Sequence, residues 1–187
     1  MKDNKKQTSL SHKIISTVDF KDIKLRDVIE DDLELIMAWR SNPQTYKYFY
    51  VQDSPLRWEE HIAFWESRKE RKDWIILFKQ NRKWRKVGSV NACNLSDNYP
   101  EVGVFIGEIT LWGKGLGKKA VGLILNWLHK NGYNGAKAKV SKENKSAQKL
   151  FEGCNFLRQK SIRNGKEWLY LVNFSNEKLQ RIKKRIK

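Results

Sequence analysis

The nine residues from 111 to 119, Leu-Trp-Gly-Lys-Gly-Leu-Gly-Lys-Lys, constrain the fold more than any other part of the chain. They lie between an apolar segment typical of a strand, residues 101–107, and about fifteen residues with the periodicity of an amphipathic helix. Glycines allow several backbone N–H groups to turn toward one concavity, and a helix N-terminus adds its positive dipole end. This arrangement predicts a pyrophosphate site, to which Lys114, Lys118 and Lys119 add positive charge.

Two well-known glycine-rich loops do not fit this spacing. A Walker P-loop requires Ser or Thr after its lysine, and Lys119 stands where the hydroxyl that binds magnesium should be. The dinucleotide fingerprint GxGxxG fails at its third glycine, because Lys118 follows Gly113-Lys114-Gly115-Leu116-Gly117. On the loop alone, a plain structural turn remains open.

A second segment, Glu-Asn-Lys-Ser-Ala-Gln-Lys-Leu-Phe-Glu-Gly-Cys-Asn-Phe at residues 143–156, follows after one further strand. The order strand, GKGLG, helix, strand and this segment resembles the acyl-coenzyme A signature of the GNAT (general N-acetyltransferase) superfamily, over about residues 23–174. The resemblance implies a single-domain α/β (α+β) fold, the GNAT acyl-CoA N-acyltransferase fold. Its mixed sheet of about seven strands is flanked by helices. It also implies acetyl-CoA as the acetyl donor.

The resemblance further implies that the loop amides bind the pyrophosphate of coenzyme A and that the preceding strand hydrogen-bonds its pantetheine. The implied cofactor-binding residues are Phe105, Ile106, Gly107, Trp112, Gly113, Lys114, Gly115, Leu116, Gly117, Lys118, Asn144, Ala147 and Phe151. Three positions depart from the family: Trp112 replaces Arg or Gln, Asn155 replaces Gly, and Phe151 replaces the frequent Tyr. The last change removes the usual proton donor to the departing thiolate, so solvent or another Tyr would have to suffice.

Acetyl transfer to an amine needs a neutral nucleophile, a polarised thioester carbonyl and a base near the acceptor. The resemblance implies direct attack without an acyl-enzyme. Glu101 is the first candidate for the base, and His61 and Glu108 are further candidates; each is as readily a surface carboxylate or a packed histidine. Cys154 has no histidine near it in the sequence, which favours a buried structural role.

Two segments of the N-terminal half bear on the acceptor: MAWRSNP at residues 37–43 and WEEHIAFW at residues 58–65. They resemble bacterial N-acetyltransferases that act on nucleotide-linked 4-amino sugars in the pseudaminic acid pathway. Less closely, they resemble ribosomal-protein N-terminal and aminoglycoside acetyltransferases. On the first interpretation Arg40 pairs with a diphosphate, Trp39 or Trp65 stacks on uracil or sugar, and His61 lies near the acceptor. Core packing of the tryptophans remains the alternative.

The net charge of +17 attracts anions but does not choose among a nucleotide sugar, a phosphorylated cofactor and nucleic acid. A polycationic aminoglycoside would be repelled. Acetylation of a protein amine stays open. So does binding to RNA or the ribosome, for which residues 79–86 with Trp84 are the one basic stretch interleaved with an aromatic residue. We rank binding to nucleic acid third, below a small-molecule acceptor and a protein amine.

The cysteines, the histidines and the apolar segments limit the other classes of protein to which the chain could belong. Two unpatterned cysteines and three separated histidines predict neither a disulfide framework nor a metal site. The chain has neither an apolar run that could span a bilayer nor the apolar core of a signal peptide, so a cytoplasmic protein is expected. The expected assembly is a monomer or a homodimer. The expected organisation is a flexible polar leader over residues 1–13, the acetyltransferase domain over 14–174, and a basic helix or tail over 175–187.

The predicted elements follow the order βααβββαβαββ. Strands are expected within residues 14–28 and at 74–78, 86–92, 101–107, 136–140, 156–161 and 168–172, and helices at 31–41, 55–71, after the glycine-rich loop, and at 144–152.

Overall fold

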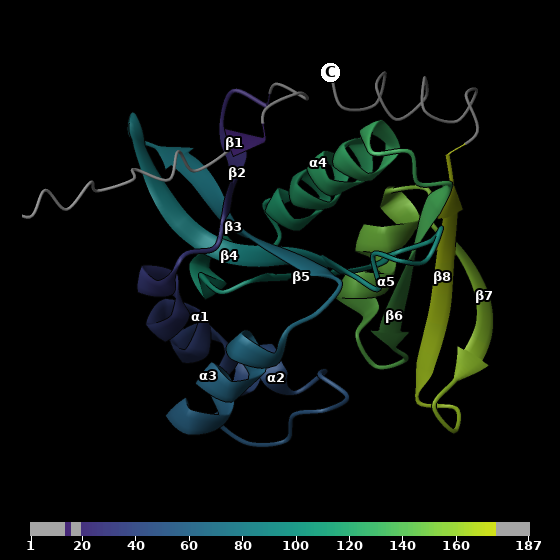
Figure 1. Cartoon of the computed structure of the whole chain (residues 1–187), viewed down its shortest axis with the longest axis horizontal. Coiled ribbons are helices and arrows are strands. Elements are labelled where there is room, and N and C mark those ends of the chain that lie inside the picture. The colour runs from purple at the N-terminus through teal and green to yellow at the C-terminus, as the bar shows by residue number, and fades with distance from the viewer. Residues whose placement is uncertain (1–13, 16–19, 175–187) are drawn as a thin grey trace, which may run out of the picture.

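Eight strands form one mixed sheet in the computed structural model, which describes residues 14, 15 and 20–174 (Figure 1). Their order is β1-β2-β3-β4-β5-β6-β8-β7, and each neighbouring pair is antiparallel except β5 with β6. The strands are β1 (Ile14–Ile15), β2 (Ile23–Asp27), β3 (Arg71–Gln80), β4 (Lys83–Cys93), β5 (Glu101–Ile106), β6 (Gly135–Ser141), β7 (Leu157–Ile162) and β8 (Glu167–Asn173). β1 has only two residues, and the other seven strands are longer, which agrees with the predicted mixed sheet of about seven strands and confirms the predicted fold class.

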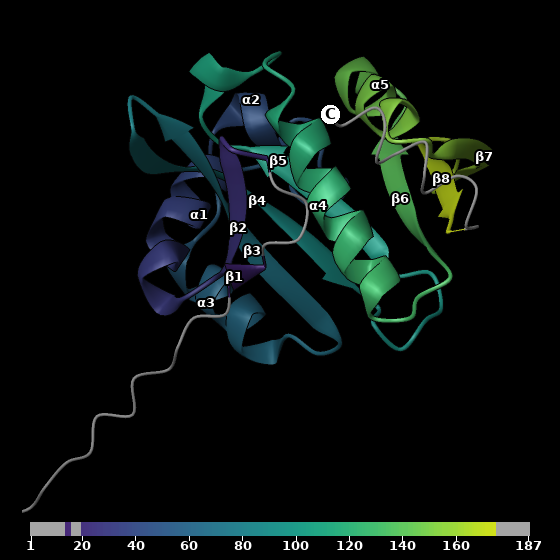
Figure 2. The same ribbon diagram turned by 90° about the horizontal axis from the view of Figure 1, so that it is seen from above.

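Five α-helices in the described part of the chain cover both faces of this sheet. They are α1 (Leu33–Arg40), α2 (Pro43–Tyr46), α3 (Trp58–Ser67), α4 (Leu116–Lys130) and α5 (Lys145–Gly153). Successive strand residues point to opposite faces, so Trp74 and Ile76 pack with α4, whereas Ile75 packs with α1 and α3. Figure 2 shows α1 and α4 on opposite sides of β2 and β4. None of the described helices is long and apolar enough to cross a membrane.

The feature that positions the site is the splay between β5 and β6. These parallel strands are in register only at Glu101 and Lys137, and then they diverge. In Figure 1, β5 and β6 run in different directions. Residues 102–106 of β5 therefore have no strand partner in β6, and their backbone groups on that side are available to another molecule.

The predicted elements are all present, and the differences lie at their ends. β3 and β4 extend to a turn at Asn81 and Arg82, whose φ values are 49° and 64°. The polar residues 79–85, between the two predicted strands at 74–78 and 86–92, are therefore mostly strand. The short helix α2 was not predicted; Asn42 caps it by accepting a hydrogen bond from the Gln44 amide. The strand predicted within residues 14–28 is divided into β1 and β2. The predicted leader at 1–13 and tail at 175–187 lie outside the described residues.

Asp32 anchors the start of α1 and is fully buried. It accepts hydrogen bonds from Arg26 Nη2 at 2.8 Å and the Ile29 amide at 3.0 Å, and Lys86 Nζ lies 2.6 Å away. Burial raises the pKa of Asp32, but these partners outweigh it, so the pKa lies below its usual value.

A depressed carboxyl pKa in the folded state stabilises the protein fully above the unfolded-state pKa, and this contribution is lost as the pH falls through the folded-state value. We expect Asp32→Asn to lower the free energy of unfolding by about 2–3 kcal/mol at neutral pH, because Arg26 and Lys86 lose their shared partner. The difference should shrink in acid, below the model-peptide pKa of 3.8. Urea denaturation at several pH values measures it. Asp31→Asn, at the exposed neighbouring position, is the control; equal losses in the two variants would contradict the assignment.

Candidate functional site

The glycine-rich loop joins β5 to α4 in a conformation that requires its glycines. Gly113 and Gly115 have φ values of 77° and 75°, in the left-handed region that favours glycine, and no atom lies within 4 Å of the position of an added Cβ. Gly115 is the N-cap of α4, so the unpaired amides of the first turn begin there. The loop is held to β5 by Trp112, whose indole N–H donates to the Ile106 carbonyl at 2.7 Å.

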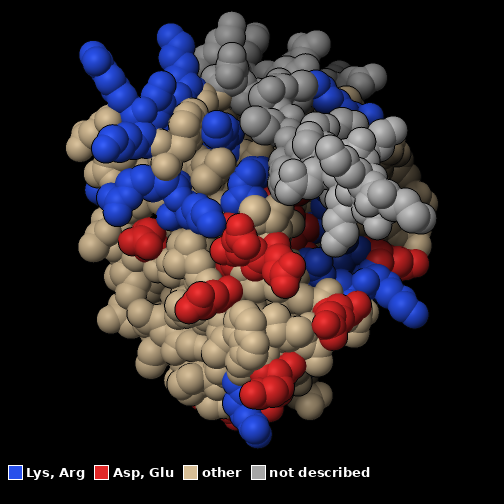
Figure 3. Space-filling view, turned by 60° about the vertical axis from the view of Figure 1, so that its left-hand side comes forward, with Lys and Arg blue, Asp and Glu red and all other residues tan. Residues whose placement is uncertain are grey.

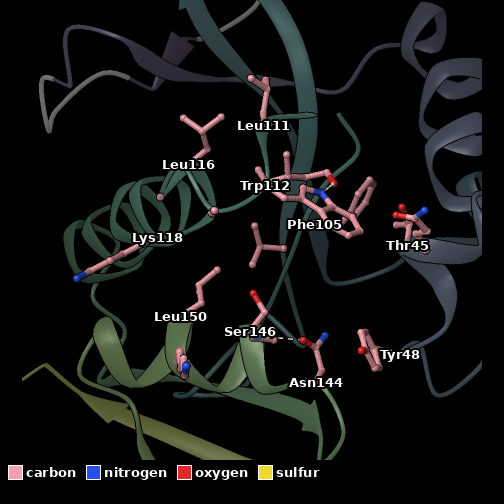
Figure 4. A pocket seen from close by; sticks show the side chains of 18 of the residues that line it. Thr45, Tyr48, Phe105, Leu111, Trp112, Leu116, Lys118, Asn144, Ser146 and Leu150 are labelled. Carbon is pink, nitrogen blue, oxygen red and sulfur yellow. Dashed lines mark hydrogen bonds between the residues drawn. The ribbon is translucent and has the colours of Figure 1, made fainter. Parts of the chain in front are cut away.

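A cavity of about 400 Å³ lies in front of this loop, and we call it the donor cavity. Its walls are the end of β5, the loop with the first turn of α4, the start of α5, and the segment around α2 (Figure 4). Lys118 lies at one end of it, and Tyr48 and Asn144 lie at the other. It therefore joins a positively charged helix N-terminus to the free edge of β5.

Most of the predicted cofactor-binding residues line the donor cavity. They are Phe105, Ile106, Trp112, Gly113, Gly115, Leu116, Gly117, Lys118, Asn144 and Ala147. The sequence did not indicate Thr45, Tyr48 and Ser146, which also line it. Ser146 and Ala147 lie in the first turn of α5, which Asn144 caps by accepting a hydrogen bond from the Ala147 amide at 3.0 Å.

Three predicted cofactor-binding residues do not line the donor cavity, and the structure gives each another place. A Cβ at Gly107 would lie 2.1 Å from the ring of Trp39, so this glycine makes room for the tryptophan. Lys114 is exposed on the outside of the loop. Phe151 is 4% exposed, meets Phe156 edge-on at 5.1 Å, and borders the neighbouring cavity instead.

The shape and chemistry of the donor cavity fit acetyl-CoA. The loop amides, the first turn of α4 and Lys118 would hold a pyrophosphate, because they combine free N–H donors with positive charge. The free edge of β5 at Val104 and Ile106 would hydrogen-bond the amides of an extended pantetheine chain, as a neighbouring strand would.

A second cavity of about 450 Å³ lies beyond the splay, and we call it the acceptor cavity. It is enclosed by α1, α3, the segment between α2 and α3, and the faces of β3 to β6 and β8. Six residues line both cavities: Tyr48, Phe49, Val104, Phe105, Asn144 and Ala147. The two cavities therefore meet at the splay, where a group held in one can react with a group held in the other.

The acceptor cavity contains four cationic and four acidic side chains: Arg40, Arg71, Lys139, Arg163, Glu60, Asp73, Glu101 and Glu167. Three of the acids have basic partners. Asp73 is 2.9 Å from Arg71, Glu101 is 2.7 Å from Lys139, and Glu167 is 3.2 Å from Arg163. Burial raises the pKa of Glu167, with Glu101 adding to this while Arg163 and Lys139 oppose it. Sequence patterns did not indicate Arg71, Arg163 or Glu167, which come from β3, the β7–β8 turn and β8.

Arg40 differs from the other cations of the acceptor cavity. No carboxylate lies within 4.0 Å of it among the described residues; its Nη2 donates to Gln52 Oε1 at 3.1 Å. Burial lowers its pKa and Arg71 lowers it further, while Asp73 opposes both. The guanidinium lies over the rings of Phe49 and Phe64, at 5.6 and 5.9 Å. A half-buried cation without an acidic partner is suited to bind an anion.

The three predicted base candidates differ in their access to the acceptor. Glu101 lines the acceptor cavity at the point where the splay begins. Glu108 lines neither cavity and accepts a hydrogen bond from Trp39 Nε1 at 3.2 Å, which corrects its predicted catalytic role to a structural one. His61 is 1% exposed, and its burial lowers its pKa. Although His61 borders the acceptor cavity, it is enclosed by its neighbours and is not placed to take a proton from a bound amine.

His61 instead connects α3 to α1. Its Nε2 lies 2.9 Å from the Leu33 carbonyl and 3.1 Å from Trp65 Nε1. A carbonyl only accepts and an indole N–H only donates, so one tautomer satisfies only one of these contacts. The hydrogen bond to Leu33 raises the pKa but does not offset the effect of burial.

The two tryptophans predicted to stack on the acceptor mainly contact other residues of the protein. Trp39 is buried, packs against Gly107 and lines neither cavity, so its predicted stacking role is corrected to packing. Trp65 borders the acceptor cavity, but the guanidinium of Arg68 lies 3.8 Å from its ring centroid. The aromatic residues that line the acceptor cavity and are not buried include Tyr48, Phe49, Tyr50, Phe64 and Phe105.

These features are suited to a class of protein: an acyltransferase that would hold an acyl thioester at the helix N-terminus and along the splayed strand, next to a separate acceptor cavity. Residues 22–157 match the model of the acetyltransferase (GNAT) domain family, and the chain belongs to this family. The predicted fold and the predicted acetyltransferase family are thereby confirmed, and acetyl-CoA is the donor that this family uses.

An uncharacterized protein of Methanocaldococcus jannaschii is 50% identical over 151 residues, which are 81% of this chain. The match covers 31% of that protein, so this chain spans about a third of the length of its relative. The crystal structure of a domain from the same organism has a TM-score of 0.79 at 49% identity, and the match covers 81% of this chain and 98% of that domain.

Two more distant structures share the fold. A spermidine N-acetyltransferase from Vibrio cholerae, in complex with CoA and spermine, has a TM-score of 0.70 at 16% identity, with coverage of 82% of this chain and 96% of that one. An aminoglycoside acetyltransferase in complex with coenzyme A has a TM-score of 0.71 at 15% identity, with coverage of 85% and 98%. At these identities the likeness extends to the fold alone.

Proposed function

We propose that this chain transfers an acetyl group from acetyl-CoA to the primary amine of a small anionic acceptor, by direct attack of the amine. The observation that carries the proposal is the junction of the donor and acceptor cavities at the splay of β5 and β6. A covalent acetyl-enzyme is not needed. The cysteine nearest the cofactor loop, Cys154, is buried, and burial raises the pKa of its thiol to about 12.

The residues at the junction of the two cavities would each carry out one part of the acetyl transfer. Bound acetyl-CoA supplies the activated acetyl group. The free N–H groups of β5 near Phe105 would polarise a carbonyl oxygen placed against that edge. Glu101 lines the acceptor side and would take the proton that the amine loses as the carbon–nitrogen bond forms. Enclosure of both reactants by the two cavities supplies the proximity of nitrogen and carbonyl carbon.

Cationic and acidic side chains are equal in number in the acceptor cavity, but Arg40 has no acidic partner there among the described residues. This unpaired cation supports an acceptor with negative charge, and in particular a nucleotide-linked 4-amino sugar of the UDP type. Arg40 has donors that no protein carboxylate occupies, and a diphosphate would satisfy them through two parallel hydrogen bonds. Phe49 and Phe64 flank the guanidinium and offer ring faces to a base or sugar. A cavity of about 450 Å³ lies in the range of small-molecule sites.

The electrostatic field of the whole protein also favours a negatively charged acceptor. On the face in Figure 3, Lys and Arg gather at one end, beyond a band of Asp and Glu. The exposed basic residues of the β3–β4 hairpin, which include Lys79, Arg82, Lys83 and Arg85, contribute to the net charge of +17. Such a field raises the local concentration of a dianionic substrate and repels a polyamine or an aminoglycoside.

A second candidate function is binding of an RNA or a ribosomal partner, with acetylation of a protein amine. The observation that favours it is Trp84, 38% exposed on the same hairpin, with Lys24 Nζ 4.2 Å and Lys79 Nζ 5.8 Å from its ring centroid. Aromatic rings among cations are common in nucleic-acid sites. None of these three residues lines the donor cavity or the acceptor cavity, so we rank this function below acetyl transfer to a small molecule.

The variant Arg40→Met tests the anionic acceptor. We expect the KM for a UDP-linked 4-amino sugar to rise about 10- to 100-fold, because the diphosphate loses a charge-assisted bidentate partner, while the KM for acetyl-CoA stays within about twofold. Steady-state thiol release measures both. Arg82→Met, which removes the same charge from the exposed hairpin turn, is the matched control. Equal rises in the acceptor KM of the two variants would show that Arg40 acts only through the net charge of the protein and does not bind the diphosphate.

A further inference from the structure

The donor side of the site lacks the proton donor that acyl transfer from a thioester calls for. When the carbon–sulfur bond breaks, the thiolate has to gain a proton, and the motif on α5 usually provides a tyrosine for it. Phe151 stands at that position here, packed edge-on against Phe156 and without a hydroxyl. The proton therefore comes from solvent or from another acidic group, which would have to reach the sulfur from a different wall of the site.

The sulfur must lie where the two cavities meet, because the amine approaches from the acceptor cavity and the rest of the donor fills the donor cavity. Of the six residues that line both cavities, Tyr48 is the one with an ionisable O–H. Four of the others are apolar, and the side chain of Asn144 is engaged in capping α5. Figure 4 shows Tyr48 next to Asn144, on the wall opposite Lys118.

The chain around Tyr48 is held in place by its neighbours. Thr45 is buried in α2, and the Phe49 amide donates to the Tyr46 carbonyl at 2.7 Å. Phe49 packs edge-on against Phe105 of β5, with ring centroids 6.3 Å apart. The Tyr48 hydroxyl itself has no hydrogen-bond partner among the residues that the structure describes, so its proton is available to a ligand.

We propose that Tyr48 is the proton donor to the coenzyme A thiolate, in the place of the missing tyrosine on α5; this rests on the proposed acetyl transfer. As the amine nitrogen bonds to the carbonyl carbon and the carbon–sulfur bond breaks, the Tyr48 O–H proton passes to sulfur. The proton lost by the amine goes to Glu101 and then to solvent, and the tyrosinate regains a proton from solvent. The products are the amide and the free thiol, so protons and electrons balance.

The proposal is tested without an acceptor, by titrating the thiol of bound coenzyme A through the ultraviolet absorbance of its thiolate, with desulfo-coenzyme A as the blank. A hydroxyl that donates to sulfur stabilises the thiolate and lowers the pKa of the bound thiol. We expect Tyr48→Phe to raise that pKa by about one unit relative to the wild type. Tyr46→Phe is the matched control, because Tyr46 lies two residues away and lines neither cavity. It should leave the pKa of the thiol unchanged.

The double variant Tyr48→Phe/Phe151→Tyr adds a second readout. It returns a hydroxyl to the position on α5 and should reverse at least half of the rise in the thiol pKa that Tyr48→Phe causes. An unchanged thiol pKa in Tyr48→Phe would overturn the proposal. So would a loss of coenzyme A binding at pH 6, because the hydroxyl is assigned to the reaction and not to binding. Neither outcome bears on the identity of the acceptor, so a failure here is distinguishable from a failure of the proposed acceptor.

Discussion

Gly115→Val should weaken the binding of acetyl-CoA by about 100-fold or more. With a φ of 75°, Gly115 occupies a backbone conformation that a β-branched residue strongly disfavours, so the turn into α4 has to rearrange. The amides of the loop and first helical turn then no longer converge on one pyrophosphate. Loss of two hydrogen bonds to a charged group, at about 1.5 kcal/mol or more each, corresponds to this factor. Isothermal titration calorimetry measures it.

The matched control for this variant is Gly132→Val. Gly132 has a φ of 84°, follows the other end of α4, and also has open space where a Cβ would be added. Both variants should lose about 1–3 kcal/mol of stability from backbone strain, but only Gly115→Val should lose affinity for acetyl-CoA. Comparable affinities in the two variants would show that the loop does not form the pyrophosphate site.

Glu101→Gln should lower kcat by about 100-fold or more, with little change in the KM for acetyl-CoA. The amide keeps the shape of the side chain but cannot accept the proton from the attacking amine. Glu101 lies on the acceptor side, so the donor cavity is untouched. Initial-rate measurements at saturating donor and acceptor separate the two parameters.

Glu108→Gln is the control, because Glu108 is also a carboxylate at an end of β5 but lines neither cavity. We expect its kcat to stay within about threefold of the wild type. If Glu101→Gln keeps at least a third of the wild-type kcat, Glu101 is not the base. Glu167, which lines the same cavity, would then become the carboxylate to replace.

The donor cavity was predictable from the sequence because its motif is local. The loop, the first turn of α4 and the start of α5 each contribute consecutive residues, and the glycine conformations are needed whatever surrounds them. Gly107 is an exception. Gly107 was predicted to contact the cofactor, but its missing side chain accommodates Trp39, a residue far away in the sequence. Local pattern does not carry information about such a close approach.

The acceptor cavity was only partly predictable, because its residues come together through tertiary structure. Arg40 and Glu101 were identified from their neighbours in the sequence, and both line the cavity. Arg71, Arg163 and Tyr48 were not, since they lie in a strand, a hairpin turn and a short segment without a motif. The ends of β3 and β4 were missed for a related reason: the outer part of this hairpin is exposed, so it lacks the apolar alternation of a half-buried strand.

The central claim is acetyl transfer from acetyl-CoA to an amine on an anionic acceptor. The most direct measurement follows thiol release from acetyl-CoA with a UDP-linked 4-amino sugar, an aminoglycoside, a polyamine and an N-terminal peptide as acceptors. We predict turnover with the UDP-linked amino sugar and none with the two polycations. Turnover with a polycation and none with the nucleotide sugar would contradict the anionic acceptor. Binding of acetyl-CoA without thiol release in the presence of any of the four amines would contradict acetyl transfer.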